Sequence, residues 1–589
     1  MNRQSTSSIQ RCARALAITL VTCAMMAFAL QGPVLAQDPA KSKAAKIAEV
    51  MMTANKYRLF NGSVLVAENG KVIYKKGLGL ANMEWNIPNA PDTRFRLGSI
   101  TKQFTATLVL QLVEQGRIKI DSKITDYLPD YRKDTGGKVT IHNLLTHTSG
   151  IPNYTGLPGF NEVSRDPYSV EEFVKKYTSN DLEFEPGSKF SYSNSGYFIL
   201  GAIIEKVTGQ RYEQVLKERI LDPLGMKNSG YDHYANILER RAAGYQKTPD
   251  GYVNAPYLDM SLPFAAGAIY STVDDLYLWD QALYTDRVLS AHSKDLMFKP
   301  FLSDYAYGWN VTNASYGTGT ERTLQIRHDG GINGFSTIIV RFPEQKHLIV
   351  LLDNTAQGRS LEQLYREITN VLYDQPYNLP KMSVAEALFK TIGEKGIDAA
   401  LAQYRDLKAS KASAYDFSEP ELNRLGYQLL QGKKIKEAVE IFKLNVAEYP
   451  QAFNTYDSLG EAYMAGGNTE LAIQNYKKSL ELNPQNAGAV AVLKRLENKT
   501  AVVDTSAYDA YVGEYEVTPA FVVKVFKDGE KLMTQATNQP AFEMYPEGEN
   551  NFFLKVVDAK VTFVKDDQGQ VTGLVIHQGG RDIPGKKVK

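Results

Sequence analysis

The spacing of apolar residues changes along the chain, and its first part, about residues 45–375, mixes strand-like with helical patterns. Near the start, residues 62–67 and 72–77 flank an Asn-Gly turn, which is typical of a β-hairpin. A second hairpin pattern, residues 335–342 and 348–352, stands near the end. Strands at both ends of a helical middle predict an α+β sheet that is completed by distant parts of the chain.

The second part, about residues 383–498, has a helical pattern that repeats. Leu425, Gly426, Ala438, Phe442 and Pro450 return 34 residues later as Leu459, Gly460, Ala472, Tyr476 and Pro484. This pattern resembles the tetratricopeptide repeat, in which a small residue lets two antiparallel helices approach and a proline ends the second helix. Helices at 383–408 and 487–498 are expected to cap the two repeats. A protein or peptide partner would suit the concave face of such a block.

The third part, residues 505–589, returns to short β-type runs. They include residues 522–526, 560–564 and 571–576, and turn sequences such as Asp528-Gly529 separate them. Runs of this number and length predict a small antiparallel β-barrel. The segment resembles the lipocalin-like tail found on some secreted serine hydrolases.

Residues 1–36 have the pattern of a secretory signal peptide. Arginines precede an apolar run at residues 15–30, and Val34-Leu35-Ala36 offers small residues for cleavage. The alternative is a retained anchor, but the run is shorter than the roughly 20 residues that cross a bilayer. Cleavage would remove both cysteines and leave a mature chain without a disulfide or a membrane span. Such a protein would work in a bacterial periplasm or outside the cell.

The overall composition is that of a folded protein and indicates no charged partner. Of the 589 residues, 43% are hydrophobic and 23% are charged, and the formal net charge is +1. This near balance provides no global positive field, so we expect no nucleic-acid partner. The length predicts several domains rather than one core.

Ser99 and Lys102 form the single S-x-x-K pattern of the sequence. Apolar residues at 104, 108 and 112 predict a buried helix that begins at or just before Ser99, which places both side chains on one face. A serine at a helix start gains from the positive end of the backbone dipole. A nearby amine can stabilise its alkoxide or take its proton. The alternative interpretation is a helix-capping serine beside a solvated lysine.

Tyr192 and Asn194 form a Y-x-N pattern in a polar loop that leads into an apolar helix. A phenol and an amide at such a place can point together from the loop into a cleft. Two other Y-x-N patterns, at residues 234 and 252, have no helix directly after them and are interpreted as turns.

His328, Gly330 and Gly331 belong to an H-x-G-G sequence that runs into the predicted strand at 335–342. Glycines at this place would let a substrate backbone approach and would present free N–H donors. Taken alone, the pattern also fits a glycine turn with an exposed histidine. A second H-x-G pattern, at residue 577, lies in the β-type tail and is discounted.

The three motifs follow one another in the order S-x-x-K, Y-x-N, H-x-G. In this order the chain resembles the penicillin-recognising serine hydrolases, a family that includes class C β-lactamases, DD-peptidases, D-aminopeptidases and esterases. The stretches 144–150 and 266–272 look like the same family. The resemblance implies that Ser99 is the nucleophile of an acyl-enzyme and that Lys102 and Tyr192 shuttle its proton, in an order that the sequence leaves open. Asn194 would bind the acyl-side amide of the substrate. The backbone N–H groups of Ser99 and Gly331 would form the oxyanion hole.

One residue departs from the pattern of the family. β-Lactamases and DD-peptidases typically carry lysine or arginine at the place of His328, and imidazole is largely neutral at pH 7. The change favours the D-aminopeptidase, CubicO-type peptidase and esterase branches over a true β-lactamase. His142 and His147 show no metal-ligand spacing and are interpreted as turn chemistry, so we expect neither metal nor cofactor.

The sequence thus predicts a secreted serine hydrolase with a β-lactamase/transpeptidase-like α+β domain, helical repeats and a small antiparallel barrel. Its substrate would be a small molecule or peptide with an amide or ester bond. The alternative is a sensor or scaffold that binds penicillin or a cell-wall peptide, deacylates slowly and recruits a protein through its repeats. A third possibility is that the repeats and barrel only shield or assemble the hydrolase.

Overall fold

The computed structural model describes residues 42–248, 251–317, 322–500, 508–519, 521–529, 531–537, 539–546, 550–554, 559–578 and 581–589. The expected signal peptide, residues 1–36, lies outside this part of the chain. The structure divides into two compact units between Lys381 and Met382, and each is described by itself. No helix within the described ranges is both long and apolar enough to cross a membrane.

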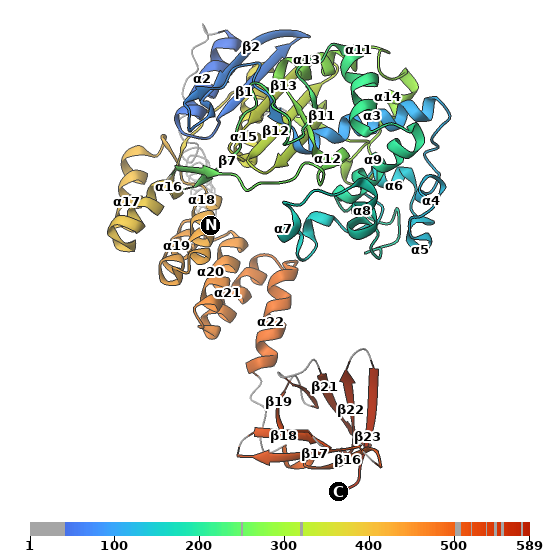
Figure 1. The fold of residues 1–589 in the computed structure, drawn as a ribbon. Helices are drawn as coiled ribbons and strands as arrows, with labels where there is room; N and C mark the ends of the chain where they lie inside the picture. The colour runs from blue at the N-terminus through green and yellow to red at the C-terminus, as the bar shows by residue number, and fades with distance from the viewer. Residues whose placement is uncertain are drawn as a thin grey trace, which may run out of the picture. The chain divides into compact units, whose positions relative to one another are not determined.

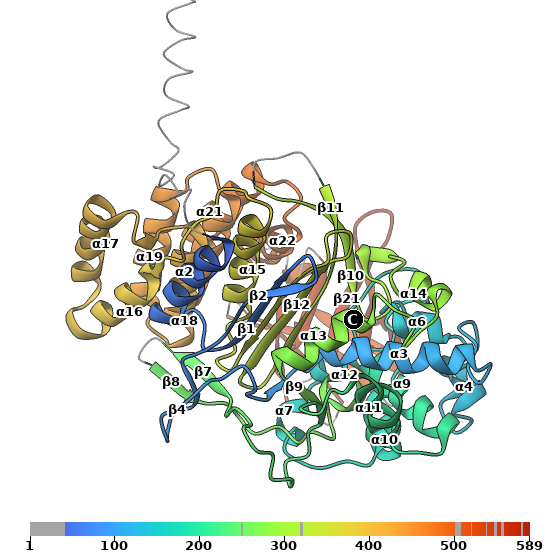
Figure 2. The same ribbon diagram turned by 90° about the horizontal axis from the view of Figure 1, so that it is seen from above.

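The first unit is built on a six-stranded antiparallel sheet in the order β10-β11-β12-β13-β1-β2 (Figures 1 and 2). The first hairpin of the chain joins the last one, because β1 pairs with β13 and places Val64 opposite Leu351. The predicted α+β sheet completed by distant segments is therefore confirmed. The strands are β1 (Gly62–Glu68), β2 (Lys71–Leu78), β10 (Asn310–Ser315), β11 (Arg322–Ile332), β12 (Phe335–Phe342) and β13 (His347–Asp353).

Side chains of the central strands alternate between two apolar clusters, one on each face of the sheet. Val64 and Val66 pack with α2 (Lys43–Lys56) and α15 (Gly358–Leu372). Leu65 and Ala67 belong instead to a larger core that includes the helices of the other face. Figure 2 shows these layers, with α2 and α15 on one side of the strands and α3 and α13 on the other. Burial on both faces explains why β12 and β13 are apolar along most of their length.

The larger core surrounds helix α3 (Thr101–Glu114), whose residues are buried from Thr101 to Leu110. Helices α9 (Asn194–Thr208), α12 (Phe264–Gly267) and α13 (Val273–Ala282) accompany it. The shorter helices are α4 (Ile124–Tyr127), α5 (Lys133–Gly136), α6 (Ile141–Leu145), α7 (Phe160–Val163), α8 (Val170–Phe173), α10 (Tyr212–Leu216), α11 (Asp222–Leu224) and α14 (Ala291–Met297). The short strands are β3 (Leu80–Asn82), β4 (Ile87–Pro88), β5 (Phe95–Arg96), β6 (Gly230–Tyr231), β7 (Tyr245–Thr248), β8 (Gly251–Asn254) and β9 (Ile269–Ser271).

The second unit begins with helices that pair in sequence order. They are α16 (Val384–Lys395), α17 (Ile397–Lys411), α18 (Glu419–Gln431), α19 (Ile435–Glu448), α20 (Phe453–Ala465), α21 (Thr469–Leu482) and α22 (Ala487–Thr500). The repeated glycines stand where an aromatic ring of the next helix arrives. A Cβ atom on Gly426 would lie 2.4 Å from the Phe442 ring, and one on Gly460 would lie 3.2 Å from the Tyr476 ring. The helical block is confirmed, whereas its assignment as tetratricopeptide repeats stays a prediction.

The second unit ends in a closed barrel of eight antiparallel strands, preceded by α23 (Tyr508–Tyr511). The barrel closes because β16 pairs with β23 as well as with β17. Its strands are β16 (Gly513–Thr518), β17 (Phe521–Asp528), β18 (Lys531–Ala536), β19 (Phe542–Pro546), β20 (Asn551–Leu554), β21 (Ala559–Lys565), β22 (Val571–Gln578) and β23 (Arg581–Lys587). Buried aromatic side chains, among them Tyr515, Phe552 and Phe563, form its core. The predicted barrel is confirmed, and its likeness to lipocalins stays a prediction.

The unequal glycine contacts of the helical block lead to a first prediction. Gly426→Ala should lower the free energy of unfolding by about 1–3 kcal/mol, because the new methyl group overlaps the buried Phe442 ring. Gly460→Ala should cost less, because the Tyr476 ring needs to move by only a few tenths of an ångström and the better helix propensity of alanine offsets part of that cost. Urea unfolding of both full-length variants, followed by circular dichroism, measures the difference. Equal losses in the two variants would contradict this account of the glycines.

Candidate active site

Ser99 lies in a 3₁₀ turn, Gly98–Ile100, that continues directly into α3. The helix start expected at or just before Ser99 is therefore present. Gly98 has a φ of +56°, and a Cβ atom on it would come within 3.0 Å of the Gly331 backbone. A Cβ atom on Gly330 would overlap the carbonyl oxygen of Leu97. Glycines on both sides thus let strand β11 lie directly against the turn that carries Ser99.

Lys102 lies one turn along from Ser99, fully buried, and its Nζ is surrounded by three acceptors. It donates to Ser99 Oγ at 3.0 Å, to Asn194 Oδ1 at 2.8 Å and to the carbonyl oxygen of Ala266 at 2.9 Å. Burial lowers the pKa of Lys102 well below its usual value, and the negative charge of Asp329 offsets part of this effect. A neutral amine has a lone pair, so Nζ in this position can also accept the hydroxyl proton of Ser99.

Tyr192 and Asn194 reach the site from the loop that precedes α9. Asn194 is the first residue of that helix, and its backbone N–H donates to Asn153 Oδ1 at 3.1 Å. The ring of Tyr192 has its centroid 4.9 Å from Lys102 Nζ. Burial raises the pKa of Tyr192, although a hydrogen bond with Ser99 lowers it in part. The Tyr192 phenol is therefore protonated at neutral pH.

His328 is buried, with both ring nitrogens engaged. Its Nδ1 is 2.6 Å from the Asp329 carbonyl oxygen, which can only accept, so Nδ1 carries the proton. Its Nε2 lies 2.9 Å from the hydroxyl of Tyr305, which therefore donates to the Nε2 lone pair. Burial lowers the pKa of His328 to about 4, although the negative charge of Asp329 raises this pKa in part. The imidazole is neutral at pH 7, and the interpretation of an exposed histidine in a glycine turn does not hold.

The structure brings the predicted residues together, because Ser99, Lys102, Tyr192 and Asn194 contact one another and the backbone of Gly331 lies against the Ser99 turn. His328 stands beside Tyr192, with ring centroids 6.4 Å apart. The second H-x-G pattern lies elsewhere: His577 is in β22 of the barrel, where its Nδ1 meets Asp582. The acidic neighbour Asp329 is exposed and lines a pocket beside the start of α15.

Two residues of the site were missed from the sequence. His147 does occupy a turn, with a φ of +57°, but its buried ring also packs on Tyr192 at 4.1 Å between centroids. Its Nδ1 accepts the Ser193 N–H at 3.1 Å, which ties the turn to the loop of Tyr192. The interpretation of His147 as turn chemistry alone was incomplete, and the family-like stretch 144–150 was the available signal. Tyr305, the partner of His328, lies outside every motif.

The comparisons with known proteins identify the family of the first unit. The family model described as Beta-lactamase matches residues 43–373, and a domain of unknown function, DUF3471, matches residues 497–587. Penicillin-binding protein 4* of Bacillus subtilis (strain 168) is 30% identical over 363 residues, which cover 58% of this chain and 78% of that protein. The putative penicillin-binding protein PbpX of the same strain is 31% identical, covering 53% and 75%.

A solved structure gives the same result for the fold. The D-amino acid amidase from Ochrobactrum anthropi SV3, complexed with L-phenylalanine amide, is 26% identical with a TM-score of 0.50, and the match covers 56% of this chain and 99% of the amidase chain. Fold and site together define a serine hydrolase of the β-lactamase fold, with penicillin-binding and amidase neighbours. The chain belongs to the β-lactamase family. Its assignment to class C stays a prediction.

The buried amine leads to a prediction about pH. Because the pKa of Lys102 is lowered in the folded chain, the unfolded chain binds more protons over the range up to the free value of about 10.4. The free energy of unfolding of the wild type should therefore rise with pH, relative to Lys102→Met, until that value is reached. Urea unfolding of both proteins between pH 7 and 10 measures the difference. Parallel pH profiles would show that Lys102 keeps its ordinary pKa.

Proposed function

We propose that this protein hydrolyses amides, peptides or esters through an acyl-enzyme at Ser99, with the D-amino-acid amidase and esterase branch favoured over a true β-lactamase. Ser99 Oγ attacks the acyl carbon, the C–N or C–O bond to the leaving group breaks, and the serine proton passes to the leaving group. Water then attacks the acyl-enzyme and restores Ser99. The observation that carries this proposal is the triple contact of Lys102 Nζ with Ser99, Asn194 and Ala266.

The directions of the pKa shifts favour Lys102 as the base. Its pKa is lowered by burial, whereas the pKa of Tyr192 is raised. A neutral amine beside Ser99 Oγ takes the hydroxyl proton, and a protonated phenol donates to the departing atom. Asn194 has its Oδ1 bound by Lys102, which leaves the Nδ2 donors for the substrate. The backbone N–H groups of Ser99 and Gly331 would hold the developing oxyanion.

The neutral state of His328 indicates the kind of substrate. A buried imidazole with Nδ1 bound by Asp329 and Nε2 bound by Tyr305 supplies no positive charge for a carboxylate. A substrate that ends in an amide or ester at this place needs none. The similarity to a D-amino acid amidase supports this reading, because an amide lacks the carboxylate that the site leaves uncompensated.

Secretion and protein binding by the helical block are separate parts of the proposal. They rest on the sequence pattern of residues 1–36 and on the repeat spacing of residues 425–484. The names of the penicillin-binding relatives also favour the sensor alternative, in which the acyl-enzyme forms but turns over slowly. Comparison of the acylation burst with steady-state turnover separates a hydrolase from a sensor.

Ser99→Ala tests the proposed nucleophile. The variant should lose about 10³-fold or more in kcat against D-phenylalanine amide and short-chain p-nitrophenyl esters, since no other hydroxyl of the described residues accepts a hydrogen bond from Lys102. Its thermal unfolding should stay close to that of the wild type. Intact-mass analysis with a fluorophosphonate and a penicillin should show one adduct on the wild type and none on the variant. Retained turnover in Ser99→Ala would disprove the proposal.

His328→Lys tests the substrate preference. A cation at this position should raise kcat/KM about 10-fold or more for a peptide with a free C-terminal carboxylate, relative to the matched peptide amide, because the carboxylate gains a partner. Lys102→Met serves as the inactive control. A proportional change for both substrates would mean that residue 328 does not select the charge of the substrate.

A further inference from the structure

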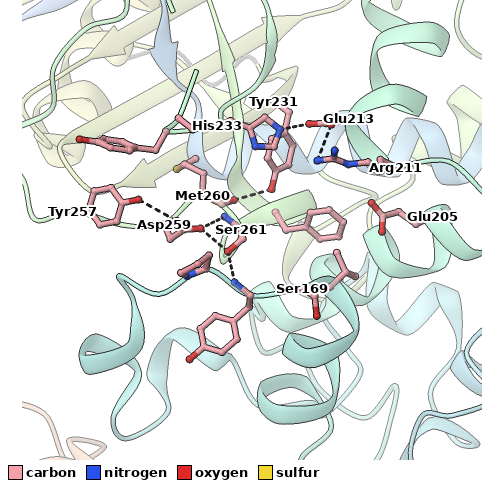
Figure 3. A pocket seen from close by; sticks show the side chains of 16 residues that line it. Ser169, Glu205, Arg211, Glu213, Tyr231, His233, Tyr257, Asp259, Met260 and Ser261 are labelled. Carbon is pink, nitrogen blue, oxygen red and sulfur yellow. Dashed lines mark hydrogen bonds and ion pairs between the residues drawn. The ribbon is translucent and has the colours of Figure 1, made fainter. Parts of the chain in front are cut away.

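The first unit has a second hollow, a pocket of about 500 Å³ that is separate from the residues around Ser99. Its lining comes from the loop before α8, from α9 and α10, from the segment around β6 and from residues 257–264. Ser99, Lys102, Tyr192, Asn194 and His328 are not among the lining residues. Figure 3 shows the side chains that face this space. The pocket therefore needs an explanation that the proposed hydrolysis does not supply.

Aromatic rings form much of the wall: Tyr168, Tyr231, Tyr234, Tyr257 and Phe264. Tyr234 and Tyr257 meet edge to face at 4.9 Å between centroids, and Tyr231 meets Phe264 in the same way at 6.3 Å. Tyr231 donates its hydroxyl to the Met260 carbonyl oxygen at 2.9 Å, which fixes the ring. The faces of such rings carry partial negative charge and attract cations.

The carboxylates of the pocket differ in whether they have a basic partner. Glu213 has two basic partners, Arg211 at 3.0 Å and His233, and these groups offset one another. Asp259 has none among the described ion pairs. It is held by neutral donors instead: Ser261 N–H at 3.0 Å, Ser261 Oγ at 2.6 Å and the Tyr257 hydroxyl at 3.1 Å. These hydrogen bonds fix the place of the Asp259 carboxylate in the wall (Figure 3).

Glu205 is a second carboxylate on the same wall without an ion pair in the described part of the chain. It is half-buried on α9, and its Oε1 accepts the Tyr212 N–H at 2.8 Å. Burial raises the pKa of Glu205, which means that its charge is poorly solvated there. A cation in the pocket would relieve this cost. Arg211 does not do so by an ion pair, because its guanidinium pairs with Glu213 and its side chain is 71% exposed.

We propose that this pocket binds an organic ammonium group, held over the tyrosine rings and beside the carboxylates of Asp259 and Glu205. Ring faces and carboxylates in one cavity are complementary to a cation that also carries apolar surface. An anion would find only Arg211 and His233, both already engaged by Glu213. The proposal does not depend on the nucleophile, since it concerns binding at residues that do not contact Ser99.

The pocket is connected to the proposed active site through one short helix. Phe264 lines the pocket and begins α12, which ends at Gly267. The next two residues after Phe264 contact α3. The Ala265 carbonyl accepts from Thr105 Oγ1 at 2.6 Å, and the Ala266 carbonyl accepts from Lys102 Nζ. An ammonium ligand that touches Phe264 thus contacts the same helix that holds the buried amine.

The probe for this proposal is benzylamine, a cation at pH 7, compared with benzyl alcohol, its uncharged isostere. Isothermal titration calorimetry of the full-length wild type at low ionic strength should show benzylamine binding about 10-fold more tightly than benzyl alcohol. Asp259→Asn keeps the shape of the carboxylate and should weaken benzylamine about 5-fold or more while leaving benzyl alcohol unchanged. Asp130→Asn is the matched control, because Asp130 is exposed and does not line the pocket.

A second variant keeps the test decisive if Asp259→Asn does not fold. Tyr234 is 60% exposed, so Tyr234→Ala should fold normally and still lose part of the cation–π attraction. Equal binding of the two probes, binding of acetate in place of benzylamine, or benzylamine affinity that neither variant changes would overturn the proposal. Because no turnover is measured, a failure here leaves the role of Ser99 untouched, and loss of turnover in Ser99→Ala leaves the pocket untouched.

Discussion

A buried lysine amine must satisfy its N–H groups within the protein, and Lys102 does so with acceptors from three parts of the chain. Ser99 precedes it by one turn, Asn194 begins α9, and Ala266 lies in α12. An unmet donor in the interior costs about 1–3 kcal/mol, so the relative position of these helices is restricted by one nitrogen atom. The Ser99 hydroxyl and the Asn194 side chain then lie close together as a consequence of this restriction.

The second constraint is the close approach of β11 to the Ser99 turn. Side chains at Gly98 or Gly330 would overlap backbone atoms of the opposite segment, so the contact requires glycine on both sides. The Thr337 hydroxyl of β12 donates to the Leu97 carbonyl at 2.7 Å and fixes the same junction from the next strand. The sheet therefore positions the backbone of Gly331, and the helices position the Lys102 amine, beside the turn that carries Ser99.

Local patterns predicted the parts of the fold that depend on neighbours in sequence. Alternation and an Asn-Gly turn located the β1–β2 hairpin to within a residue or two, and short alternating runs predicted the barrel. Three motifs located Ser99, Lys102, Tyr192, Asn194 and His328. The contacts of His147 and Tyr305 could not be found in this way, because each residue stands in a segment without periodicity and contacts a segment that is distant in sequence. The direction of each pKa shift also needed the structure, since burial causes it.

Burial acts on Lys102, Tyr192 and His328 in one direction, toward the uncharged form. In the proposed mechanism, proton transfer from Ser99 to a neutral amine would create an ion pair in a buried site, where fixed N–H dipoles act strongly on a developing oxyanion. The same environment disfavours a substrate carboxylate, which would lose its water without meeting a cation. The selection that we propose, for uncharged amides and esters, would therefore have the same cause as the lowered pKa of Lys102, namely burial. The hydrogen bond from Tyr305 to His328 Nε2 occupies the lone pair of the imidazole and so favours its neutral form.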